Sequence, residues 1–391
     1  MAVNTALVKE SFALLTPRIE SLTAYFYARL FAANPDLRTM FPSAMEEQRG
    51  RLFRSLAELV EMLDEPAGLR ARLSEMGSDH RKYGVLEEHY TAVGEALLAA
   101  LGRFLGPRWT PALRQEWTAV YHLIADTMKQ AARAAAESTP AWWIGEIVEH
   151  ERRADDLAVL TVRPDQPLPF AAGQYLTVQT SRWPREWRPY SIANPPREDG
   201  LIGLHVRALP GGWVSGALVR RSEVGQALLL GPAQGSMTLD PGSDRDLLCV
   251  AGGTGLAPLK ALAEEALARG RRVLLVFGAR TRRRLYDLDG LWALKTAHPG
   301  LRVIATVSDE PFHPGLQGTA AEALGGLRDW SEHDVYVAGP PGMISATLAR
   351  LRRLDVPDER VRHDPLPDVA ARAGGPPPDS PSTPPALDCL Q

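Results

Sequence analysis

The chain has 391 residues, more than one compact core usually holds, so two or three domains are expected. Its 45% hydrophobic and 23% charged content is ordinary for a soluble protein, and its net charge of -3 argues against non-specific nucleic-acid binding. No apolar run reaches the roughly 18 residues that span a bilayer, and the N-terminus is typical of an amphipathic helix rather than a signal peptide. The only two cysteines, Cys249 and Cys389, fit a reducing cytoplasm and exclude an iron–sulfur cluster.

Residues 1–138 carry helical periodicity throughout. Apolar side chains recur every three or four residues in four stretches, 19–30, 52–63, 90–101 and 113–128. Prolines fall at the borders between these stretches, where helices start or stop. This pattern predicts an all-α domain of six or seven helices.

One of these helical faces ends in a histidine. Leu69, Leu73, Met76 and His80 follow one another at helical spacing and therefore share one face. A histidine where a core leucine is expected needs a partner. A hydrogen-bond acceptor, a packed ring and a metal ion are all open, and a lone histidine is most often a satisfied core residue.

The period changes to two after a short linker around residues 138–140. Short apolar runs at 157–163, 174–180, 200–209 and 225–232 alternate with Pro and Gly turns. They predict an antiparallel β-barrel over residues 139–243. From 244 to 366, strand, glycine turn and helix alternate, which predicts an α/β domain with a parallel sheet. Residues 367–391 are rich in Pro and Ala, and we expect them to be a disordered tail.

Five residues of the helical segment resemble a haem pocket when they are taken in order and spacing. They are Tyr27, Phe41, Gln48, His80 and Tyr90. The segment is similar to the globin domain of bacterial flavohaemoglobins, in an actinobacterial-type variant. The resemblance implies that His80 is the proximal iron ligand, that Phe41 packs on the porphyrin and that Leu52 walls the distal pocket.

The same resemblance assigns Tyr27 and Gln48 as distal polar groups that face the oxygen ligand, a role suited to a phenol and an amide. Tyr90 matches the tyrosine of the family's proximal hydrogen-bond network. Ala134 stands where that network has a glutamate, which implies a less electron-rich iron.

Two motifs of the predicted barrel resemble the flavin site of the ferredoxin-reductase superfamily. In the first, at 188–191, the match implies that Arg188 contacts flavin phosphate, Tyr190 stacks along the flavin and Ser191 approaches the ring nitrogen. Tyr175 belongs to the same pattern. In the second, the match assigns the pyrophosphate to Gly212, Val214 and Ser215, at a helix start whose amides suit an anion.

The α/β segment contains two turns that match the nicotinamide side of that superfamily. The residues are Gly253, Thr254, Gly255 and Pro258 in the first turn, and Gly339 and Pro340 in the second. Ala338 stands where many relatives have a cysteine. Arg280 and the three arginines at 282–284 follow a strand without an acidic residue, so NADH and NADPH both remain open.

A last departure concerns the far end of the chain. No residue from Val337 to Gln391 is aromatic, although relatives usually stack an aromatic side chain on the flavin there. His363 or Pro365 would cover the ring incompletely, so we expect a more exposed flavin.

The resemblance as a whole implies a cytoplasmic nitric oxide dioxygenase that detoxifies nitric oxide under nitrosative stress. Electrons would pass from NADH or NADPH to FAD and then to haem b iron, with NO and O2 as substrates. Two alternatives stay open: a reductase-coupled globin acting on O2 or peroxides, and a haem-based sensor of O2 or NO. We expect only small-molecule partners, no nucleic acid or membrane, and a monomer or weak dimer.

Overall fold

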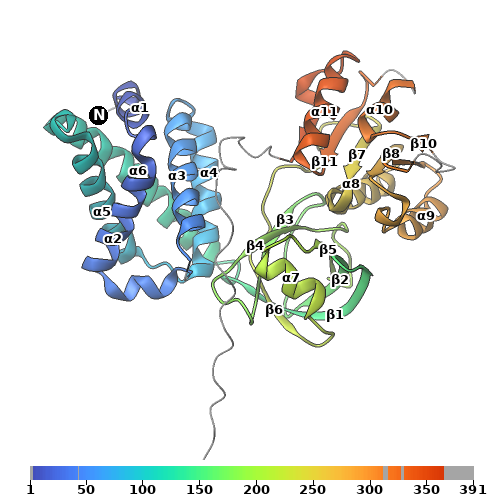
Figure 1. The fold of residues 1–391 in the computed structure, drawn as a ribbon, viewed down its shortest axis with the longest axis horizontal. Helices are drawn as coiled ribbons and strands as arrows, with labels where there is room; N and C mark the ends of the chain where they lie inside the picture. The colour runs from blue at the N-terminus through green and yellow to red at the C-terminus, as the bar shows by residue number, and fades with distance from the viewer. Residues whose placement is uncertain (1–2, 43, 311–315, 327–329, 365–391) are drawn as a thin grey trace, which may run out of the picture.

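The computed structural model describes residues 3–42, 44–310, 316–326 and 330–364. It shows a helical domain, an antiparallel barrel and an α/β domain in chain order (Figure 1). The predicted fold class and its order are therefore confirmed. The predicted tail, residues 367–391, lies outside the described residues.

Within the described residues, six α-helices build the N-terminal domain: α1 (Thr5–Ala13), α2 (Ile19–Ala33), α3 (Glu46–Glu61), α4 (Pro66–His80), α5 (Glu87–Leu105) and α6 (Pro111–Ala136). Proline opens α4 and α6, where its missing N–H and fixed φ cost nothing. Helices α4 and α6 pack closely because Gly77 has no side chain. A Cβ there would lie 2.3 Å from the carbonyl oxygen of Met128. Any larger residue would therefore push the last turn of α4, which ends at His80, away from α6.

The second domain is a six-stranded antiparallel sheet in the order β4-β3-β6-β1-β2-β5. Its strands are β1 (Trp143–Ala154), β2 (Leu157–Pro164), β3 (Tyr175–Thr180), β4 (Arg188–Ser191), β5 (Ile202–Arg207) and β6 (Ala227–Leu230), and α7 (Trp213–Arg220) follows β5. A bridge between Ile192 and Leu204 connects the two ends of the sheet and nearly closes the barrel. Sequence periodicity missed β1, because its second half is largely exposed and polar.

The third domain is a six-stranded parallel sheet in the order β10-β9-β8-β7-β11-β12. Its elements are β7 (Leu247–Gly252), α8 (Leu256–Ala268), β8 (Val273–Ala279), α9 (Leu288–Ala297), β9 (Leu301–Val307), β10 (Leu316–Gln317), α10 (Ala320–Ala323), β11 (Asp334–Ala338), α11 (Pro341–Arg352) and β12 (Val361–His363).

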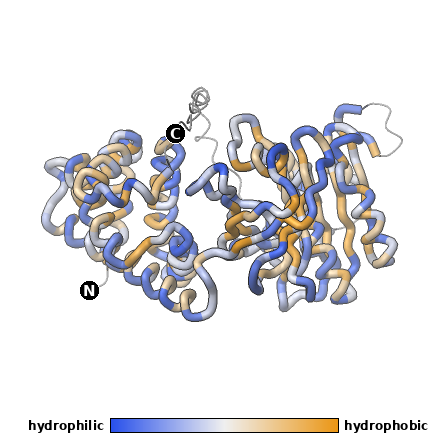
Figure 2. Tube along the Cα trace, turned by 90° about the horizontal axis from the view of Figure 1, so that it is seen from below, coloured by the Kyte–Doolittle hydropathy of each residue, from blue (hydrophilic) through white to orange (hydrophobic). Residues whose placement is uncertain are grey.

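Both faces of this parallel sheet are covered, as such sheets require. One apolar core joins the sheet to α8 and α9, and a second joins it to α10 and α11. Figure 2 shows hydrophobic stretches gathered in these strands. Of the residues described, no helix combines the length and the hydropathy needed to cross a bilayer.

Candidate functional site

The helical domain holds a buried phenol that is hydrogen-bonded to an amide. Gln48 on α3 donates from Nε2 to the Tyr27 hydroxyl on α2 at 3.3 Å. Tyr27 is 4% exposed, and burial raises the pKa of its hydroxyl to about 12, although the bond from Gln48 opposes the shift. The phenol is therefore protonated at neutral pH. Because its oxygen accepts from Gln48, its proton is available for another acceptor.

Aromatic side chains surround this pair. The Phe41 ring lies 5.6 Å from the Tyr27 ring and 5.2 Å from the Phe31 ring, measured between centroids. Leu52 is half-buried and packs against the same core. The structure thus brings four of the predicted pocket residues, Tyr27, Phe41, Gln48 and Leu52, to the same part of the domain.

His80 is the last residue of α4, and one of its ring nitrogens is committed. Nδ1 lies 2.7 Å from the carbonyl oxygen of Met76, one turn earlier on the helix. A carbonyl only accepts, so Nδ1 carries the proton and Nε2 keeps a free lone pair. Burial lowers the pKa of the imidazole, which keeps it neutral. A neutral imidazole with an oriented ring and a free Nε2 fits the axial ligand of a haem iron.

The predicted proximal network has a different arrangement. The Tyr121 hydroxyl donates to the backbone carbonyl of Tyr90, and Gly94 leaves room for the Tyr121 ring. In the described part of the chain, the Tyr90 hydroxyl makes no hydrogen bond to His80. Ala134 is exposed on α6. The role assigned to Tyr90 stays a prediction, and Met76 supplies the hydrogen bond that orients His80.

The flavin motif occupies β4, paired with β3. The register places Tyr175 opposite Ser191 and Leu176 opposite Tyr190. The Arg188 guanidinium lies 2.9 Å from a carboxylate oxygen of Glu186 and 2.8 Å from one of Glu47, on the helical domain. Sequence reasoning missed both carboxylates. Glu47 comes 141 residues earlier, beyond the reach of any local pattern, whereas Glu186 stands two residues before Arg188 and could have been noticed. A flavin phosphate at Arg188 must therefore compete with them.

The turn before α7 is built around two glycines. Gly211 has a φ of +70°, and a Cβ on Gly212 would lie 2.5 Å from the Ser215 hydroxyl. The side chains of Val214 and Ser215 are buried, so their backbone N–H groups are the polar groups left at the helix start. This turn fits a pyrophosphate held by main-chain amides.

The two glycine turns of the α/β domain touch each other. A Cβ on Gly255 would lie 2.3 Å from the carbonyl oxygen of Ala338, and a Cβ on Gly339 would lie 2.9 Å from that of Gly252. Gly253 has a φ of +54° and Gly339 one of +151°, so both backbones favour glycine. In the first turn, Thr254 lies between Gly253 and Gly255, and Pro258 is buried in the first turn of α8. In the second turn, Pro340 directly follows Gly339. The carboxyl ends of β7 and β11 therefore adjoin at the point where the strand order reverses, which is where doubly wound sheets bind ligands.

The arginines that follow β8 differ in their partners. Arg284 pairs with Asp156 of the barrel. Arg280, Arg282 and Arg283 are exposed, and the structure gives them no ion pair with any described residue. Three exposed cations without an ion pair to a described residue thus follow β8, the strand next to β7.

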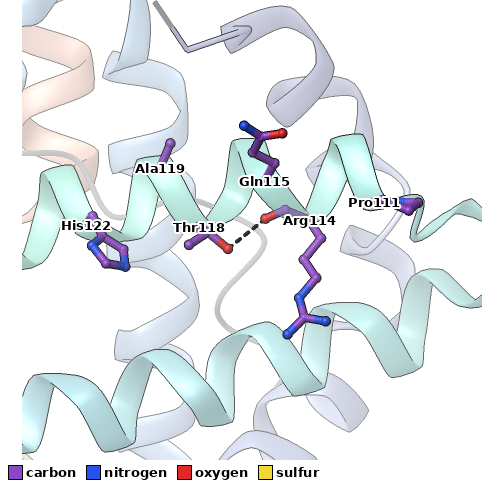
Figure 3. Close-up of a pocket in the computed structure, with 6 residues that line it drawn as sticks. All are labelled: Pro111, Arg114, Gln115, Thr118, Ala119 and His122. Atoms are coloured by element: carbon purple, nitrogen blue, oxygen red, sulfur yellow. Dashed lines mark hydrogen bonds between the residues drawn. The ribbon is translucent and has the colours of Figure 1, made fainter. Parts of the chain in front are cut away.

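A separate surface depression lies on the outer face of α6 and is lined by Pro111, Arg114, Gln115, Thr118, Ala119 and His122 (Figure 3). None of the predicted site residues lines it. The Thr118 hydroxyl donates to the carbonyl of Arg114 at 2.8 Å, so it is already satisfied within the helix. This depression does not contribute to the site.

Family models match each domain separately. Residues 24–128 match the globin model, 145–238 the oxidoreductase FAD-binding domain and 249–348 the oxidoreductase NAD-binding domain. The class of protein is therefore a globin fused to a reductase that uses haem, FAD and a nicotinamide nucleotide, as the sequence predicted.

Relatives extend this match over nearly the whole chain. A flavohemoprotein of Bordetella pertussis is 28% identical over 388 residues, covering 91% of this chain and 96% of its own. The flavohemoglobin structure from Malassezia yamatoensis has a TM-score of 0.78 at 20% identity and covers 93% of this chain and 98% of its own. An electron transfer component of xylene/toluene monooxygenase from Pseudomonas putida is 36% identical over 56% of this chain and 63% of its own. The chain belongs to the flavohaemoglobins.

Proposed function

We propose that the protein is an NAD(P)H-dependent nitric oxide dioxygenase. The observation that carries the proposal is the buried Tyr27–Gln48 pair, present in the same chain as two adjoining nicotinamide-type turns. A protonated phenol in an apolar pocket stabilises partial negative charge on an oxygen ligand. The adjoining turns indicate that electrons enter from a nicotinamide nucleotide.

The bound groups would supply two kinds of chemistry: haem iron held by His80 binds O2, and FAD divides the electron pair of NAD(P)H into single electrons. The chain's own residues orient them. Met76 fixes the His80 ring, and Tyr27, with Gln48 bonded to its oxygen, would offer its O–H to an oxygen ligand. The turns at Gly212 and Gly255 hold phosphate groups with main-chain amides, and Tyr190 and Ser191 lie along the flavin strand.

The overall reaction balances as two NO, two O2 and one NAD(P)H giving two nitrate ions, NAD(P)+ and one proton. The test is stopped-flow consumption of NO under air by the holoprotein, with nitrate counted against nucleotide oxidised. Two nitrates per nucleotide are expected, and Tyr27→Phe should slow the reaction.

Two other outcomes would replace this proposal. Fast nucleotide oxidation without nitrate would identify a reductase acting on O2 or peroxides. Little steady turnover with NO and O2 present would favour a sensor.

The exposed cations that follow β8 favour NADPH over NADH. Arg280 and its neighbours Arg282 and Arg283 are exposed and free of ion pairs within the described chain, and a 2′-phosphate is their natural partner. The KM for NADPH should rise in Arg280→Ala while that for NADH stays constant. Equal changes for both nucleotides would contradict this assignment.

We further propose that the enzyme works in the cytoplasm as a monomer or weak dimer, without nucleic-acid or membrane partners. The net charge of -3 supports the absence of a nucleic-acid partner, since the chain has no excess of basic residues to attract a polyanion. Light scattering on a sizing column and cell fractionation would test these points.

The domain limits at residues 138, 243 and 366 are proposed on the changes of periodicity, and limited proteolysis would test them.

A further inference from the structure

Lys82 is a buried cation that the proposed reaction does not use. It lies in the short turn Arg81–Tyr83, directly after α4 and two residues beyond His80. Its side chain is 1% exposed. A lysine ammonium is rarely buried unless charge and hydrogen bonds compensate for the water that it loses.

The groups around this ammonium come from two domains. Within the helical domain, Asp79 Oδ1 lies 2.5 Å from Nζ. From the barrel, the Thr177 hydroxyl on β3 accepts from the same nitrogen at 2.9 Å. Nζ also lies 5.0 Å from the ring centroid of Tyr83 and 5.3 Å from that of Trp187, which is in the barrel. Cation–π contact from both domains thus adds to the ion pair.

Asp79 makes a second connection to the barrel. Gln234 donates from Nε2 to Asp79 Oδ1, and the Gln234 Oε1 accepts from the Tyr175 hydroxyl at 3.1 Å. Two residues close to His80 in sequence therefore contact the barrel: Lys82 bonds to Thr177 on β3, and Asp79 bonds to Gln234, which in turn holds Tyr175 of β3. The site is closely fitted, because a Cβ on Gly231 would lie 2.3 Å from the Thr177 hydroxyl and 3.4 Å from Cδ of Lys82.

Other polar contacts between these domains are more open to water. The Arg188–Glu47 pair has side chains that are 29% and 57% exposed, and Arg81 bonds to Thr139 in the linker. Exposed pairs contribute little to a docked geometry, whereas hydrogen bonds from buried charged groups to the other domain fix orientation, because a misplaced partner would leave a buried polar group unsatisfied.

We propose that the contacts that Lys82 makes with Thr177 and Trp187, together with the bond from Gln234 to Asp79, dock the helical domain on the flavin barrel, and that electron transfer between the two domains depends on them. This inference rests on the proposed function. Electrons would leave the flavin site one at a time and arrive at the haem site. Lys82 and Asp79 neither give nor take a proton, so they act as positioning residues.

The test uses full-length holoprotein and three variants. Lys82→Met removes the charge at nearly constant volume, and Thr177→Val removes the partner from the other domain. Lys129→Met is the matched control, because Lys129 pairs with Asp126 at 2.8 Å with the same spacing of three residues, but the two side chains are 26% and 67% exposed. Anaerobic stopped-flow follows flavin reduction by NAD(P)H and haem reduction separately. Small-angle X-ray scattering of the same samples measures the separation of the domains.

In Lys82→Met, haem reduction should slow at least ~tenfold, and the radius of gyration should increase. Thr177→Val should likewise slow haem reduction and increase the radius of gyration. If Lys82→Met does not fold, Thr177→Val alone tests the proposal. Flavin reduction in each variant and all properties of Lys129→Met should stay within about twofold of wild type.

Haem reduction at the wild-type rate in both interface variants would overturn the proposal. Slower haem reduction with unchanged scattering would also overturn it, because the residues would then act on the haem site rather than on docking. Failure of the proposed function is distinguishable, since loss of nitrate production leaves these anaerobic rates and the scattering unaffected.

Discussion

The contact between the two nicotinamide-type turns offers a sharp perturbation. A Cβ on Gly255 would lie 2.3 and 2.4 Å from the carbonyl oxygen and carbon of Ala338 and 2.5 Å from the nitrogen of Gly339. All three are backbone atoms, so a methyl group cannot be accommodated by a side-chain rotation. In Gly255→Ala, the ends of β7 and β11 must therefore move apart.

Overpacking of this kind costs about 1–3 kcal/mol. If that cost falls on the nucleotide-binding geometry, the KM for NAD(P)H rises roughly 5- to 150-fold. Gly342→Ala is the matched control, because Gly342 lies in the first turn of α11, directly after the second turn, and a Cβ there would meet no atom within 4 Å apart from its chain neighbours and its own helix backbone.

The assay is steady-state reduction of ferricyanide by NAD(P)H, which needs the reductase domains but not the haem. Gly342→Ala should keep the wild-type KM. Haem reduction by dithionite should be the same in both variants, because the helical domain is untouched. A wild-type KM in Gly255→Ala would refute the reasoning, since it would show that the two turns separate without affecting the nucleotide.

Four further outcomes are expected. Tyr27→Phe should raise the rate of oxygen dissociation about tenfold or more, because a hydrogen bond to a charged group contributes roughly 1.5–3 kcal/mol; an unchanged rate in flash photolysis would remove Tyr27 from the distal site. Ala134→Glu should lower the haem midpoint potential by redox titration, and no shift would show that this exposed position does not influence His80. Arg271→Ala breaks a buried 2.6 Å pair with Asp334 and should cost about 3–5 kcal/mol in urea unfolding, with a loss under 1 kcal/mol counting against it. Haem-free protein should release more superoxide than a relative with an aromatic flavin cover, and equal release would contradict an exposed flavin.

Local patterns were sufficient to predict the three-domain order and many of the elements. The stripe ending at His80 predicted α4, and the glycines at 253–255 predicted a turn between a buried strand and a helix; the structure has both. Such signals work because helical periodicity and the conformational freedom of glycine depend on neighbouring residues. Strand β1 and the two short strands β10 and β12 were missed, since exposed or very short strands carry little alternation.

The candidate site shows the same difference between features that the local sequence predicts and features that it does not. By itself, the sequence determined which residue types are present and in what local frame: a histidine on an apolar face, a phenol, an amide and glycine turns. Tertiary structure alone decided their partners. It placed Glu47 on Arg188, Thr177 on the Lys82 ammonium and Ala338 against Gly255, pairs that are 83 to 141 residues apart. Contacts at such separations depend on how whole domains pack, and no local periodicity encodes that packing.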